Sequence, residues 1–281
     1  MFIEINGARI FFDVIGSGLR PEGPQMVERP TLLILHGGPG YDHSTSRPYF
    51  DRYADAYQVV YLDHRGCGRS EADQSTWTLD QWADDIATFC ERLGIEKPLV
   101  FGQSFGGMVA MHYAARHPEG PSKLVLSSTA ARFDLPATIA KARDLGGDGA
   151  AKVAEAFFTN PTLEGYEEYG RVCLPLYNQG KSNESPDFIN RAIQRPEVTV
   201  HFFRNEMMEM DLRPGISAIT CPTLVLGGME DPVTPVVCSE EIAEAIGDNA
   251  RLEMFEGCGH GVHRDDPDGA EQVMRAFLAE T

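Results

Sequence analysis

One serine in the chain has the flanks of an enzyme nucleophile. Ser104 stands in the run Gly102-Gln103-Ser104-Phe105-Gly106, after the apolar residues 99–101 and before a helical pattern over residues 108–117. A strand that turns straight into a helix crowds the backbone beside the turn, which favours glycine because it has no Cβ. The pattern therefore predicts a strand, a sharp turn and a helix, with the hydroxyl of Ser104 presented at the turn for nucleophilic attack.

A serine hydroxyl needs a general base, and that base needs a carboxylate to orient it. Asp231 comes shortly after the strand-like run 223–226, and His260 comes shortly after the run 251–255. Because ligands of open α/β sheets bind at the carboxyl ends of the strands, both side chains are expected to converge on Ser104. The sequence thus predicts a triad of serine, histidine and aspartate.

Neighbouring residues offer alternatives for two members of this triad. Glu230 precedes Asp231, and His263 follows His260. Asp231 is preferred because Pro232 would fix its direction, and His260 is preferred because its flanking glycines leave room for a ring. His260 and His263 could also form a metal pair, but no third ligand lies at a suitable spacing. We therefore predict neither a metal nor another cofactor.

A reaction at a carbonyl also needs donors for the negative charge that develops on its oxygen. Backbone N–H groups serve best, because they are fixed before the charge appears. One donor is expected to be the N–H of Phe105, directly after the serine. The other is expected in the loop His36-Gly37-Gly38-Pro39-Gly40, which follows the apolar run 31–35. We assign Gly38 as this donor, with Gly37 as the alternative, and expect His36 to organise the loop.

The elements that would position these residues alternate between short apolar strands and helices. An Asn6-Gly7 turn predicts a β-hairpin near the start, and Pro21 to Pro30 is expected to be a loop. Such alternation is typical of an α/β fold with a mostly parallel sheet of about eight strands and helices on both faces. The other strands are predicted at residues 31–35, 58–62, 99–101, 123–127, 223–226 and 251–255, and the main helices at residues 78–93, 108–117, 236–246 and 267–278.

The alternation stops between about residue 130 and residue 213. This stretch has helical fragments and the aromatic pairs Phe157-Phe158 and Phe202-Phe203, with no clear buried strand. An insertion at this point would lie over the carboxyl ends of the strands, where ligands bind in open α/β sheets. We therefore predict a core domain of residues 1–129 and 214–281 and a helical cap of residues 130–213.

Composition narrows the class of protein. The 281 residues carry 24 basic and 42 acidic side chains, a formal net charge of −18, which opposes binding to nucleic acid or to an anionic membrane. No apolar stretch is long enough to span a bilayer, and the start lacks a secretory signal. The six scattered cysteines fit free thiols in a reducing compartment. We expect a cytoplasmic protein that acts on a small molecule or short peptide, of unspecified oligomeric state.

Taken together, these motifs resemble the α/β-hydrolase fold superfamily across essentially the whole chain outside the insertion. The loop at 36–40 and the run Asp63-His64-Arg65-Gly66-Cys67-Gly68-Arg69-Ser70 are similar to the proline iminopeptidase group, serine peptidases that release N-terminal residues from short peptides. That group usually has Gln where His64 stands. Its proline-specific members have Gly and Trp at the positions of Gln103 and Phe105. The resemblance therefore implies that Ser104 is the nucleophile, but it does not imply the same substrate specificity.

The resemblance implies carboxylates in the cap that bind the free α-amino group of the substrate. Glu206 and Glu209 are the candidates, because residues three apart share one face of a helix. An ordinary solvated acidic face is the other interpretation of this pair.

The function that we expect is an aminopeptidase that works through an acyl-enzyme on Ser104. An esterase, lactonase or amidase for a small neutral molecule is the alternative, because it would use the same chemistry with a different pocket. A ligand receptor that kept the fold but lost the reaction is a third class, and the intact triad argues against it.

Overall fold

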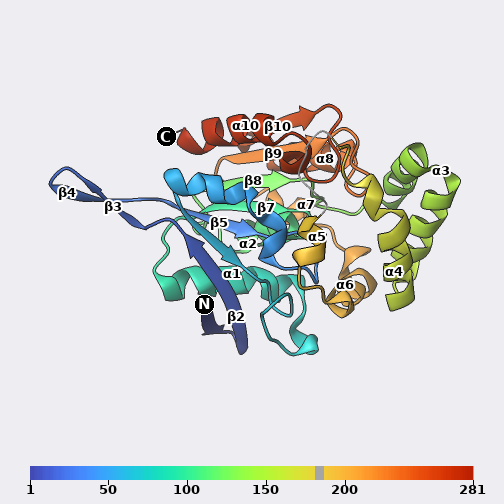
Figure 1. Cartoon of the computed structure of the whole chain (residues 1–281), viewed down its shortest axis with the longest axis horizontal. Helices are drawn as coiled ribbons and strands as arrows, with labels where there is room; N and C mark the ends of the chain where they lie inside the picture. Colours follow the sequence, from blue (N-terminus) through green and yellow to red (C-terminus); the bar gives the residue numbers. More distant parts are fainter. Residues whose placement is uncertain (181–186, 281) are drawn as a thin grey trace.

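A single mixed sheet forms the centre of the molecule (Figure 1). The computed structural model describes residues 1–180 and 187–280. Eight strands form this sheet in the order β1-β2-β6-β5-β7-β8-β9-β10. Strand β2 runs antiparallel to both of its neighbours, and the strands from β6 to β10 pair in parallel, which confirms the predicted sheet. The strands are β1 (Phe2–Ile5), β2 (Ala8–Ile15), β3 (Leu19–Glu22), β4 (Gln25–Glu28), β5 (Thr31–Leu35), β6 (Gln58–Leu62), β7 (Leu99–Gln103), β8 (Lys123–Ser127), β9 (Thr223–Gly228) and β10 (Ala250–Phe255).

Helices cover both faces of the sheet because its central strands are apolar on both sides. In β5, Leu33 and Leu35 pack into the core under α1 and α2, whereas Leu32 and Ile34 pack into the core under α10. This division follows from the two-residue period of a strand. The helices are α1 (Leu79–Leu93), α2 (Phe105–Arg116), α3 (Leu135–Thr159), α4 (Leu163–Val172), α5 (Asp187–Arg191), α6 (Pro196–Phe202), α7 (Arg213–Ile216), α8 (Val236–Ile246), α9 (Val262–Asp265) and α10 (Pro267–Ala279).

Local signals account for the main boundaries. Thr78 caps α1 by accepting a hydrogen bond from the N–H of Gln81 at 3.2 Å, and Gly94 ends the helix with φ of 65°. The Asn6-Gly7 turn of the first hairpin has φ of 48° and 71°, the left-handed values that such two-residue turns require. None of the described helices has the length and apolar character needed to cross a membrane.

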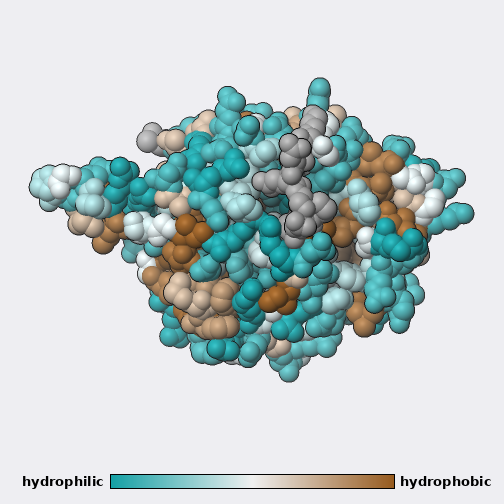
Figure 2. All heavy atoms as spheres, in the orientation of Figure 1, coloured by the Kyte–Doolittle hydropathy of each residue, from teal (hydrophilic) through white to brown (hydrophobic). Residues whose placement is uncertain are grey.

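The expectation of a loop at residues 21–30 was wrong. Strands β3 and β4 pair there as a separate two-stranded hairpin, with Glu22 opposite Gln25 across a turn at Gly23. It projects from the body at the left of Figures 1 and 2. The strand residues are all exposed, so no buried alternation marks them in the sequence.

The segment between β8 and β9 carries α3 to α7 and no strand among its described residues. We refer to residues 130–213 as the cap segment, following the predicted division. Helices α3 and α4 lie side by side at the right of Figure 1, and hydrophobic residues gather on the visible surface over them (Figure 2). A break at Gly147, with φ of 74°, interrupts α3.

Candidate active site

Ser104 occupies the predicted turn between β7 and α2. Its backbone has φ of 52° and ψ of −120°, a conformation that non-glycine residues rarely adopt. A side chain at Gly102 would clash with the carbonyl of Gly106, and one at Gly106 would clash with the carbonyl of Leu35. The two glycines are therefore required because β7, α2 and β5 approach one another at backbone distance beside the serine.

Asp231 and His260 are brought together at the ends of β9 and β10. Nδ1 of His260 lies 2.9 and 3.0 Å from the two carboxylate oxygens of Asp231. The carboxylate is fully buried and also accepts hydrogen bonds from the N–H groups of Val233 and Thr234 and from the hydroxyl of Thr234, at 2.8 to 2.9 Å. These donors hold the anion in place, so it can orient the imidazole with Nε2 directed away from it.

Ser104 and His260 line the same cavity. Within the described residues no hydrogen bond joins the hydroxyl of Ser104 to His260. Contacts of this kind often tighten only when substrate is bound. The structure therefore holds the aspartate and histidine of the predicted triad in contact and brings Ser104, the predicted nucleophile, to the same cavity.

The alternative acid and base are engaged elsewhere. Glu230 forms an ion pair with Lys141 at 2.8 Å. His263 packs against the rings of Tyr49 and Phe50, and burial holds the pKa of its imidazole well below the ordinary value. Among the residues that the structure describes, neither Glu230 nor His263 forms a side-chain hydrogen bond with a member of the predicted triad.

The loop after β5, which is predicted to supply one oxyanion donor, lies beside the serine: a side chain at Gly37 would contact the Cβ of Ser104. Gly38 has φ of 54°, and a side chain there would meet the ring of Tyr41. The N–H of Phe105 is the first of α2, so it has no partner within the helix. His36 braces the loop: Nδ1 lies 3.0 Å from the carbonyl of Gly37, and Nε2 accepts the N–H of His64 at 3.1 Å.

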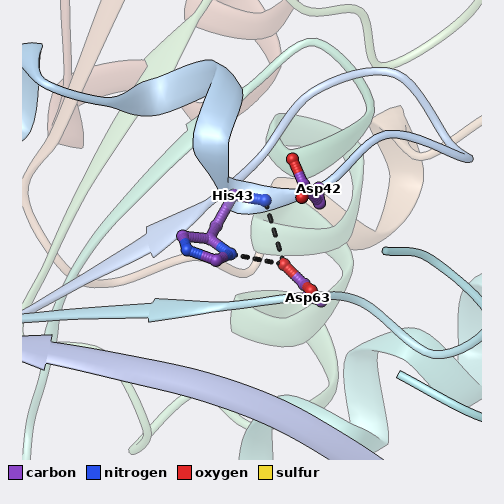
Figure 3. Close-up of side chains that lie close together, drawn as sticks. All are labelled: Asp42, His43 and Asp63. Carbon is purple, nitrogen blue, oxygen red and sulfur yellow. Dashed lines mark hydrogen bonds and ion pairs between the residues drawn. The ribbon is translucent and has the colours of Figure 1, made fainter. Parts of the chain in front are cut away.

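A buried group of Asp42, His43 and Asp63 anchors the far end of this loop (Figure 3). One carboxylate oxygen of Asp63 forms hydrogen bonds with the backbone N–H and with Nδ1 of His43, at 3.0 and 2.6 Å. The guanidinium of Arg69 donates a hydrogen bond to the carboxylate of Asp42 at 2.8 Å. Burial alone raises the pKa of Asp63, but the hydrogen bond from His43 brings it below the ordinary value. Because these hydrogen bonds already occupy the ligand atoms, we interpret the group as a structural anchor rather than a metal site.

The cavity has a volume of about 400 Å³, and six of the residues that the cap segment contributes to its wall are aromatic. The charged residues that line the cavity, within the described part of the chain, are Glu167, on the exposed face of α4, and Arg264, beside the histidine. The lining residues are Gly37, Gly38, Pro39, Tyr41, Thr45, Gln103, Ser104, Phe157, Phe158, Tyr166, Glu167, Tyr169, Gly170, Leu174, Tyr177, Asn178, Ile189, Gln194, Thr199, Phe203, Val233, His260 and Arg264.

The structure does not bring Glu206 and Glu209 to this cavity. A carboxylate oxygen of Glu206 accepts the N–H of Leu79 at 2.9 Å and so caps the first turn of α1. Burial raises the pKa of Glu206. The acidic residue that does line the cavity, Glu167, was missed. Its signal was the spacing of Tyr166 and Tyr169, three residues apart, which marks an inward face of α4 beside it.

Two sequence comparisons give matches over most of the chain. A family described as having the alpha/beta hydrolase fold matches residues 30–267. A proline iminopeptidase from Pestalotiopsis fici is 29% identical over 290 residues, covering 99% of this chain and 98% of that protein. The matched segment contains both the serine and the histidine loops.

Solved structures agree on the fold and differ in activity. A proline iminopeptidase from Mycobacterium smegmatis matches with a TM-score of 0.76 and 23% identity, over 99% of this chain and 97% of that one. An esterase from Exiguobacterium antarcticum matches with a TM-score of 0.73 and 22% identity, over 99% of both chains. At these identities the two structures speak for the fold alone.

Proposed function

The chain belongs to the α/β-hydrolase family, and from that premise we propose that it is a serine hydrolase in which Ser104, His260 and Asp231 are catalytic. The observation that carries the proposal is the buried Asp231–His260 pair at 2.9 Å, at the cavity that Ser104 also lines. A buried carboxylate that accepts this many hydrogen bonds is held in one direction. It can therefore orient an imidazole that acts as a base inside the cavity.

In the proposed reaction the oxygen of Ser104 attacks a carbonyl carbon while Nε2 of His260 takes its proton. The tetrahedral intermediate then collapses as His260 gives that proton to the departing amine or alcohol, which leaves an acyl group on the serine. Water, deprotonated by the same imidazole, attacks the acyl group and releases the acid, and the proton returns to Ser104. The backbone N–H groups of Gly38 and Phe105 are proposed to hold the oxyanion in both steps.

We infer that the substrate is an amide or short peptide with a free N-terminal amine. The likeness to proline iminopeptidases over nearly the full chain supports this choice. Glu167 takes the amine-binding role first assigned to Glu206 and Glu209, because it is the acidic residue of the described cavity wall. An ester, lactone or neutral amide is the second candidate, favoured by the aromatic wall formed by Phe157, Phe158 and Phe203.

Turnover of prolyl and alanyl naphthylamides against p-nitrophenyl acetate tests the choice. For an aminopeptidase, Glu167→Gln raises KM for the naphthylamides about tenfold, by the loss of one ion pair, and leaves the ester unaffected. The matched control is Glu168→Gln, at the next residue of α4, which does not line the cavity. Glu206→Gln provides a second comparison.

Hydrolysis of the ester alone, with no response to Glu167→Gln, would reject the aminopeptidase. A response to Glu206→Gln that exceeds the response to Glu167→Gln would instead reject Glu167 as the amine site and restore the first assignment, with the aminopeptidase kept. Failure of a fluorophosphonate to label the wild-type protein would reject the serine hydrolase itself.

A further inference from the structure

The loop that carries His260 is held from two sides. On the core side, the hydroxyl of Ser128 accepts the N–H of Gly261 at 3.0 Å, and Arg264 donates to the carbonyl of His260 at 2.6 Å. On the other side, the N–H of His260 itself donates to the carbonyl of Tyr177, in the cap segment, at 2.6 Å. The histidine backbone is therefore bonded directly to the cap.

Three successive cap residues take part in this contact, and we call Tyr177, Asn178 and Gln179 the strap. The ring of Tyr177 packs edge-on against the imidazole of His260, with the ring centres 5.0 Å apart. A side chain at Gly259 would clash with the carbonyl of Tyr177, so a glycine is needed for the strap to approach. The strap thus contacts both the backbone and the ring of the proposed base.

Asp265 joins the strap to the histidine loop. Its side chain is buried, with 2% of the residue exposed. One carboxylate oxygen accepts the N–H of Gly259 at 2.7 Å, and the other accepts the N–H of Gln179 at 2.9 Å and lies 3.4 Å from Nδ2 of Asn178. A buried anion that is shared between two segments fixes their relative position, because releasing either one leaves a buried charge short of donors.

The strap is also part of the substrate cavity. Tyr177 and Asn178 line it together with Ser104, and the hydroxyl of Tyr177 lies 3.0 Å from that of Tyr169 on α4. Tyr177 therefore touches both the space that a substrate would fill and the group that would take the proton from the serine.

We propose that Asp265 is a positioning residue, which locks the strap to the histidine loop so that the cap sets the alignment of His260. The inference rests on the proposed serine hydrolase. It predicts that damage to this lock lowers kcat rather than raising KM, because a misplaced base slows proton transfer without removing a contact to the substrate.

The test is Asp265→Asn, measured with p-nitrophenyl acetate, which is too small to depend on cap contacts. Asn keeps one acceptor and sets an amide N–H₂ against one of the two N–H donors, so the lock loosens. We expect kcat to fall about tenfold or more, with KM within about twofold, and the rate of fluorophosphonate labelling to fall in parallel with kcat. The matched control is Asp268→Asn, the same change at an exposed residue of α10, which leaves kcat unchanged.

A second variant covers the case in which Asp265→Asn does not fold. Gln179→Pro removes a single N–H donor of the strap and leaves the histidine loop intact, and we expect it also to lower kcat with KM preserved. An unchanged kcat in a folded variant, or a loss confined to KM, would overturn the inference. Both outcomes are distinct from failure of the proposed function, in which the wild-type protein itself neither labels nor hydrolyses.

Discussion

The two walls of the cavity are built in opposite ways. On the core side, the carboxylate of Asp231 accepts hydrogen bonds from four donors: two backbone N–H groups, one hydroxyl and the imidazole of His260. On the cap side, Phe157 and Phe158 contact the rings of Tyr169 and Phe203 with centres 5.0 to 5.5 Å apart. Hydrogen bonds fix direction, whereas ring contacts tolerate change of shape. The core wall therefore suits a fixed reaction, and the cap wall suits a variable choice of substrate.

Removing the proposed nucleophile is the strongest test of the core wall. Ser104→Ala is expected to lower kcat by roughly 10⁴-fold or more, because the covalent intermediate can no longer form. The measurement is steady-state turnover of p-nitrophenyl acetate together with fluorophosphonate labelling. Circular dichroism confirms that the variant folds. Turnover that persists within about tenfold of the wild type would mean that another residue performs the chemistry.

Removing the orienting charge tests whether the dense hydrogen bonding of the core wall serves catalysis. Asp231→Asn is expected to lower kcat by about 10⁴-fold, because an amide no longer holds the imidazole in the required tautomer. The matched control is Glu230→Gln, the adjacent acid, whose partner is Lys141 outside the triad. Equal losses in the two variants would remove the distinction between Asp231 and its neighbour.

The two walls also differ in how far the sequence predicts them. Strands β5, β6 and β8 and helix α8 have the bounds expected, because buried strands and amphipathic helices leave a local pattern. The glycines around Ser104 could also be predicted from the sequence, because a side chain at either position would clash with the backbone. The Asp231–His260 contact could be predicted because each residue follows the end of a strand.

Two of the misses, the place of Glu206 and the ring wall of the cap, depend on long-range contacts. The carboxylate of Glu206 accepts a hydrogen bond at the N-terminus of α1, 127 residues away in the chain. No local pattern in the sequence predicts that partner. Hairpin β3–β4 has only exposed residues and two prolines, so it lacks the continuous apolar run that identified the central strands. The ring wall of the cap is assembled from α3, α4 and residues after α6, whose relative placement is a tertiary fact.

A change in the cap wall should alter preference rather than chemistry. Phe157→Leu enlarges the cavity, and we expect the ratio of kcat/KM between a bulky and a small ester to shift by about tenfold, with kcat for the small ester within about twofold. The control is Leu163→Ala, at a half-exposed residue of α4 that does not line the cavity. A loss of kcat for every substrate would show that the ring wall, too, fixes the geometry of the reaction.

The smallest expected effect concerns the stability of the core side. His64 and His263 are buried, and burial, the largest cause, holds the pKa of each imidazole well below its ordinary 6.5. The unfolded chain therefore binds protons that the folded chain does not, so the free energy of unfolding is highest above about pH 6.5 and falls as the pH drops below it. Each histidine contributes a slope of up to about 1.4 kcal/mol per pH unit. His64→Gln removes one such group, so denaturant titrations between about pH 5.5 and 7.5 should show a shallower fall in the free energy of unfolding.

The contradicting result is a fall in the free energy of unfolding as steep as that of the wild type. It would mean that the core around the loop at residues 63–70 admits a charged ring, and that this side of the cavity is less rigid than its hydrogen bonds indicate.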